Sequence, residues 1–201
     1  AITSRKLTPT AVTATRTSRW ALLGFAILVI LLAFAPHFVP RAYVQDLLAM
    51  FILMTIAQCW NLLAGFAGLI SVGQQAFVGL GGYALFALII TLGLDPLAAL
   101  PLGAIIVTLI AVPVGFVVFR LTGAYFAVVT WVVAEVFRLL LAQWGALGGG
   151  TGNSLPRTAT SDMAGIDFVS KFMHMRSPVA RETIIYWIAL ALVVITIAVI
   201  Y

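Results

Sequence analysis

The sequence predicts an all-α polytopic membrane protein with about six transmembrane helices. Of its 201 residues, 63% are hydrophobic and only 8% are charged, an apolar share far above that of an ordinary soluble domain. The apolar residues lie in long runs, each close to the roughly 20 residues that a helix needs to cross a bilayer. Between two such runs, glycines and polar side chains crowd the stretch 61–86. Glycines at this depth are compatible with a broken or re-entrant segment.

Composition and motifs exclude several classes of function. The net charge of +5 is scattered rather than clustered on one face, which argues against nucleic-acid binding. Cys59 is the single cysteine, and His37 and His174 are far apart in sequence, so neither an intramolecular disulfide nor a metal cluster is expected. Lys6 and Lys171, the two lysines, do not follow a glycine, so there is no phosphate-binding loop. We expect no enzyme, no cofactor and no metal.

Residues 1–19 are predicted to form a basic, disordered cytoplasmic tail, because they hold four basic residues and no acid. An organellar transit peptide has a similar composition. The apolar run 20–39 is interpreted as an uncleaved first span rather than a signal peptide. Its length favours a span, and the small-residue site Ala33-Phe34-Ala35 is followed by Pro36. The transmembrane domain then occupies 20–201.

Five further spans follow from the remaining apolar runs. They are predicted at about 47–64, 76–94, 97–119, 123–142 and 183–201. The second span carries Thr55, Gln58 and Asn61 at steps of three, which places them along one broad side of a helix. The chain ends directly after an apolar run, and we expect that the natural protein continues beyond Tyr201.

The basic residues near the span ends predict the orientation. Four of them precede the first helix, which favours a cytoplasmic N-terminus and also places Arg120 in the cytoplasm. The loop 143–182 then lies outside the cytoplasm. Within this loop, apolar residues alternate with polar ones from Ile166 to Met175, which suits either a short amphipathic surface helix or an irregular loop with incidental apolar residues.

Two motifs carry a family resemblance. The first is N-L-L-x-G-x-x-G-x-x-S-x-G-x-x-x-F-x-G-x-G-x-Y, which runs from Asn61 to Tyr83. The second runs from Leu121 to Arg138 as L-x-G-x-Y-F-A-x-x-T-x-x-x-A-E-x-x-R, and Gly149, Gly150, Asn153 and Leu155 follow as a third element. In this order and spacing they resemble the signatures of the permeases of branched-chain amino-acid ABC importers. Ser154 departs mildly, because family members often have glycine there.

The resemblance implies a bacterial inner-membrane subunit that works with a second permease, two ATPase subunits and a periplasmic substrate-binding protein. Such permeases normally continue into a segment that docks on the ATPase, so the resemblance covers the N-terminal part. The candidate translocation-path residues are Asn61, Ser71, Gln74, Gln75, Tyr83, Tyr125, Thr130 and Glu135. The candidate helix-packing residues are Gly65, Gly68, Gly73, Gly79, Gly81 and Gly82.

Glu135 is the one acid inside an apolar span, and Arg138 follows it by three residues. An ionisable residue at membrane depth is expensive and by default indicates a functional site. The alternative is a self-neutralised pair near the outer interface, with Arg138 extended toward water. For any single glycine or amide of the stretch 61–86, simple helix packing and hydrogen bonding between helices is likewise an alternative.

Two other functions compete with the amino-acid permease. A urea or amide permease of the same family would share the motifs. A secondary transporter or channel would work without ATP, and we would expect an internal repeat or several buried ionisable groups in it. The sequence shows Glu135 alone and no clear repeat.

Overall fold

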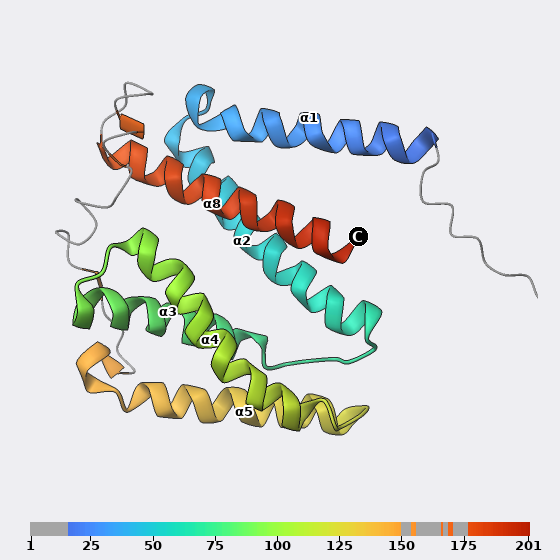
Figure 1. Ribbon diagram of the computed structural model, residues 1–201, viewed down its shortest axis with the longest axis vertical. Coiled ribbons are helices and arrows are strands. Elements are labelled where there is room, and N and C mark those ends of the chain that lie inside the picture. The colour runs from blue at the N-terminus through green and yellow to red at the C-terminus, as the bar shows by residue number, and fades with distance from the viewer. Residues whose placement is uncertain (1–15, 150–153, 156–165, 167–168, 171–176) are drawn as a thin grey trace, which may run out of the picture. The chain divides into compact units, whose positions relative to one another are not determined.

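A computed structural model describes residues 16–149, 154–155, 166, 169–170 and 177–201 (Figure 1). The described part is helical, and six of its helices are long and apolar enough to cross a membrane, as predicted. The chain divides into two compact units, one up to Asp46 and one from Leu47 onward. The first unit holds α1 (Arg16–Phe38) and the beginning of α2 (Arg41–Asn61). The candidate spans are Trp20–Phe38, Arg41–Phe66, Gln74–Leu92, Pro96–Val118, Ala124–Ala142 and Ser177–Ile200.

The observed boundaries differ from the predicted ones mainly at polar ends. Helix α1 begins at Arg16, inside the predicted tail, although its apolar part begins at Trp20. Helix α2 begins at Arg41 rather than near Leu47. The last helix, α8 (Ser177–Ile200), begins well before Thr183, inside the predicted loop 143–182. Hydropathy detects the apolar body of a helix, whereas polar first turns add no such signal.

Three helices of the second unit pack together. Helix α3 (Gln74–Leu92) packs against both α4 (Pro96–Val118) and α5 (Ala124–Ala142) (Figure 1). The α3–α4 turn is short, because Gly93 ends α3 in the left-handed conformation and the Asp95 carboxylate caps α4 by accepting from the amide of Leu97 at 2.8 Å. Proline directly follows this cap, where its missing N–H costs nothing.

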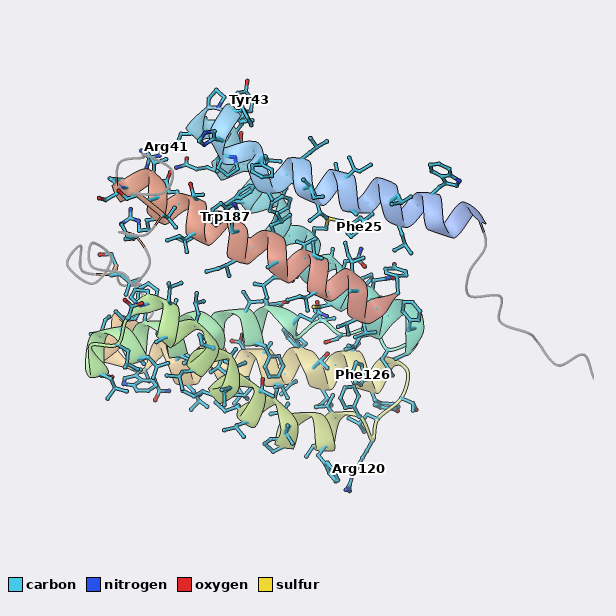
Figure 2. The ribbon with its side chains drawn as sticks, turned by 45° about the horizontal axis from the view of Figure 1, so that its top comes forward. Phe25, Arg41, Tyr43, Arg120, Phe126 and Trp187 are labelled. Carbon is cyan, nitrogen blue, oxygen red and sulfur yellow. The ribbon has the colours of Figure 1, made fainter. Side chains whose placement is uncertain are left out.

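Aromatic side chains fill the contact between α4 and α5. Phe126 is 1% exposed and stacks on Phe119 with ring centroids 5.9 Å apart. Figure 2 shows Phe126 among the helices and Arg120 at the turn, pointing away from them. The Arg120 guanidinium lies over the ring of Phe116 at 5.4 Å.

Helix α8 belongs to the same unit. Tyr186 is fully buried, and its ring lies 5.3 Å from that of Phe51 on α2. At the start of α8, Ala180 and Ile184 pack with Ile166 and Val169. Ile166 and Val169 belong to the predicted amphipathic segment. Both are helical and are buried against the start of α8. Phe168, Phe172, Met173 and Met175 lie outside the described residues.

We expect that Phe126→Ala lowers the stability of the bundle by about 1–3 kcal/mol. This is less than the roughly 3–5 kcal/mol typical of a soluble core, because the separated helices would keep their apolar surface in lipid and only packing is lost. Thermal unfolding in detergent would measure the change. Phe34→Ala, whose ring is 60% exposed, is the matched control, and an equal loss in both variants would contradict the packing role of Phe126.

Candidate functional site

The helix is broken in the stretch between Asn61 and Gln74. Helix α2 ends at Asn61 and continues as one π-helical turn, η1 (Leu62–Phe66), and the next regular helix begins at Gln74. Gly68 has φ +66°, a value that favours glycine. The amide of Leu69 donates to the carbonyl of Leu63 at 2.9 Å. The predicted break is thus present, and it precedes α3 rather than interrupting it.

The far end of this break is fixed to α5. The amide of Val72 donates to the Thr130 hydroxyl at 3.2 Å, and this hydroxyl donates to the carbonyl of Ala127 at 2.9 Å. The Ser71 hydroxyl accepts from the amide of Gly73 at 3.3 Å, and the indole of Trp60 donates to the Ser71 carbonyl at 3.1 Å. These side-chain partners satisfy backbone groups that lipid could not. We call Ser71, Val72, Gly73 and Thr130 the junction.

Gly73 is required at the junction by close approach. A Cβ added there would clash with the carbonyl oxygen of Thr130. Ser71 and Thr130 are each 8% exposed, and their hydroxyl groups are engaged with backbone atoms in this structure. The junction therefore holds α3 against α5 at one end.

A cavity of about 450 Å³ lies between α3 and α5. Its lining on α3 comes from positions one helical turn apart, and its lining on α5 comes from one side of that helix. The lining residues are Gln75, Ala76, Gly79, Tyr83, Trp131, Ala134, Glu135, Phe137, Arg138, Leu141 and Ala142. Most of the wall is apolar, and Gln75, Tyr83, Glu135 and Arg138 bring polar or charged groups to it.

The charged groups of the cavity form one ion pair. The Arg138 Nε donates to Glu135 Oε2 at 2.9 Å, and a terminal nitrogen of the same guanidinium donates to Oε1. Two parallel hydrogen bonds of this kind fix both side chains. The Glu135 side chain is 43% exposed and that of Arg138 is 65% exposed. The pair is therefore preformed, and it faces open space.

Tyr83 fixes the loop that follows α5 to the cavity wall. Its hydroxyl donates to the carbonyl of Gly149 at 2.6 Å. Gly149 has φ +53° and follows the short 3₁₀ helix η2 (Gly145–Leu147). In the described ranges no three His, Cys, Asp or Glu side chains come together as metal ligands would.

Comparison with known proteins identifies the family of this chain. Residues 43–201 match the family described as the branched-chain amino acid transport system permease component. This match covers the break, the junction and the cavity. The chain belongs to this permease family.

Two curated relatives agree with this assignment. The permease is 29% identical over 188 residues to the high-affinity branched-chain amino acid transport system permease protein LivM of Escherichia coli K12. It is 29% identical over 196 residues to the protein of the same name from Salmonella typhimurium LT2. These alignments cover 88% and 92% of this chain but 44% and 46% of the relatives, so the chain spans less than half of their length. No solved structure matches it.

The predicted path residues do not form one site in the permease. Gln75, Tyr83 and Glu135 line the cavity, whereas Ser71 and Thr130 belong to the junction. The Asn61 amide donates to the Tyr201 hydroxyl at 3.2 Å. Gln74 is not among the residues that line the cavity, and Tyr125 is 76% exposed in the first turn of α5.

Sequence reasoning did not assign Arg138 and Trp131 to the site. Both line the cavity, and the predicted pairing of Arg138 with Glu135 is present. The spacing of these residues could have indicated that they share a site with Glu135. One face of a helix carries residues three and four apart, such as Trp131, Glu135 and Arg138.

The predicted packing glycines also divide. Gly73 makes a close contact within the chain, and a Cβ at Gly65 would meet only the side chain of Asn61. At Gly79, Gly81 and Gly82 an added Cβ would meet nothing within 4 Å among the described residues. Gly79 lines the cavity. Close approach of another helix at Gly81 and Gly82 stays a prediction.

We expect that Gly73→Ala destabilises the permease by about 1–3 kcal/mol, because the new methyl group must push α3 away from the Thr130 backbone. Gly79→Ala is the matched control. It adds the same methyl group in open space within a helix, where alanine is favoured by roughly 0.5–1 kcal/mol. Thermal unfolding in detergent should therefore shift downward for the first variant only. Unchanged unfolding of Gly73→Ala would show that the junction can relax.

Proposed function

We propose that this permease forms part of the translocation path of an ABC importer for branched-chain amino acids. The observation that supports this proposal is the cavity between α3 and α5, which lies within the segment matched to the family. Its wall combines apolar side chains with an amide, a phenol and an ion pair. An aliphatic amino acid has an apolar side chain, an ammonium and a carboxylate, and this wall offers apolar contact, hydrogen-bonding groups and opposite charges to them.

The lining suits passage rather than tight capture. Gln75 and Tyr83 offer a few hydrogen bonds, while Trp131, Phe137 and Leu141 offer apolar contact. A passenger must leave as readily as it enters, so individually weak contacts favour transport. Substrate choice would then lie mainly with a periplasmic binding protein. Asn61 and Gln74 do not line this cavity, and their contact with the passenger stays a prediction.

The partners we propose are a second permease, two ATPase subunits and a periplasmic substrate-binding protein in a bacterial inner membrane. Large apolar side chains are exposed along the helices of the described part, as expected for contact with lipid or another membrane subunit. Gly81 and Gly82 offer a place where a helix of the second permease could approach closely.

The transporter assembled from the proposed subunits in proteoliposomes should accumulate leucine when ATP is supplied to the ATPase side. Gly79→Leu should lower this uptake ~10-fold, because its side chain enters the cavity and costs about 1–3 kcal/mol to accommodate. Gly24→Leu, also made in open space on α1, is the control and should transport normally. ATP-independent uptake driven by a proton or sodium gradient would contradict the proposal and favour a secondary transporter. ATP-dependent uptake of urea without leucine would favour the urea permease.

We further propose that the N-terminus and the Arg120 turn face the cytoplasm, because four basic residues precede the first helix and the first helix usually dominates topology. In a Cys59→Ala background, a membrane-impermeant maleimide added to intact cells should label Gly145→Cys and spare Thr122→Cys. Both positions lie outside the spans, and Gly145 has room for a side chain. Permeabilised cells, in which both positions should react, are the control. Labelling of Thr122→Cys alone in intact cells would reverse the orientation.

A further inference from the structure

The Glu135–Arg138 pair has hydrogen-bonding capacity left over. A guanidinium has five N–H donors and a carboxylate about four acceptor positions, and two hydrogen bonds join these two groups. Both side chains are substantially exposed and line the cavity. The remaining donors and acceptors therefore belong to side chains on the cavity wall that are open to a ligand.

The position of the pair makes charge cancellation an incomplete explanation. Glu135 lies seven residues before the end of α5 at Ala142, about 10 Å along the helix axis. Arg138 is only about 6 Å from that end, within reach of the interface for a long side chain. Its guanidinium nevertheless turns toward Glu135. The chain thus holds both a positive and a negative group at one place in the cavity wall.

We propose that this ion pair binds both charged ends of an α-amino acid zwitterion. The substrate carboxylate binds the Arg138 guanidinium, and the substrate ammonium binds the Glu135 carboxylate. The aliphatic side chain lies against Trp131, Phe137 and Leu141. This inference rests on the proposed function, and it specifies the chemical class of the passenger and the residues that contact it.

The geometry favours an α-amino acid over other charged molecules. Its ammonium and carboxylate are attached to one carbon, so they reach two protein groups that are themselves in contact. A ligand with one charge would separate the pair and leave one partner without a counter-ion. A zwitterion with distant charges could reach only one of the two groups. A neutral amide such as urea would compensate neither charge.

The exchange of partners also explains how binding remains reversible. One ion pair is broken, and two new pairs form with the ligand. When the ligand leaves, Glu135 and Arg138 restore their own bond, so neither charge remains unpaired at membrane depth. Loss of a single charge should weaken binding ~10-fold, since hydrogen bonds to charged groups are the strong ones.

The test is saturation-transfer NMR, which detects weak ligands, on the assembled transporter in lipid nanodiscs without its binding protein. Leucine should receive magnetisation from the protein. The single-charge analogues 4-methylpentanoate and 3-methylbutylamine, the extended zwitterion 6-aminohexanoate, and urea should compete with leucine at least ~10-fold more weakly. Equal competition by either single-charge analogue would overturn the proposal.

Variants locate the binding to the pair. Glu135→Gln and Arg138→Gln should each weaken leucine binding and raise the KM for leucine uptake ~10-fold. Asp46→Asn and Arg120→Gln make the same chemical changes outside this cavity and are the matched controls. A single variant with an unpaired charge risks misfolding, so the double variant Glu135→Gln/Arg138→Gln is the second probe. It removes both charges and keeps hydrogen-bonding side chains, and it too should lose leucine binding.

The outcomes separate this inference from the proposed function. If the wild-type transporter accumulates leucine and the double variant binds and transports leucine equally well, the zwitterion site is wrong while the proposed function stands. If the wild type shows no ATP-dependent leucine uptake but binds leucine through this pair, the proposed function fails and the site remains. If the control variants Asp46→Asn and Arg120→Gln abolished leucine binding as strongly as Glu135→Gln, the proposed site would also be wrong.

Discussion

A break in a membrane helix leaves backbone N–H and C=O groups that lipid cannot hydrogen-bond. The packing of the second unit depends on the side chains that bond these groups instead. Between η1 and α3 the regular hydrogen-bond ladder stops. The Thr130 hydroxyl accepts a hydrogen bond from the amide of Val72, and the Ser71 hydroxyl accepts one from the amide of Gly73. The Trp60 indole donates to the Ser71 carbonyl. A break of this kind is tolerated where protein groups replace the missing partners.

The position of the cavity follows from this constraint. Because the junction presses Gly73 against the Thr130 backbone, α3 and α5 begin their contact at a fixed distance and register. Within the next two turns, α3 presents Gln75 and Gly79, and α5 presents Trp131 and Glu135. Gly79 adds no side chain, so space remains where a larger residue would fill the gap.

Hydropathy predicts the spans well and their contacts poorly. All six spans are found near their predicted positions, because length and apolarity alone decide whether a helix can cross a bilayer. The glycines also place the break in the correct stretch. Sequence cannot rank the neighbours Gln74 and Gln75, which lie about 100° apart around a helix, and only the second lines the cavity. It likewise does not show that Thr130 binds a distant backbone amide or that Tyr83 reaches Gly149, since both bonds join residues far apart in the chain.

Hydrogen-bonding capacity separates the polar residues of this permease into two groups with different roles. At the junction, Ser71 and Thr130 are buried and their hydroxyls hold backbone groups that fix the start of α3 to α5. In the cavity, Glu135 and Arg138 satisfy each other and still face open space with donors and acceptors to spare. A transport site needs the second arrangement, because it must exchange partners without cost to the fold. The junction gives the rigidity on which such an exchange depends, and this division of roles follows from which polar atoms the backbone already uses.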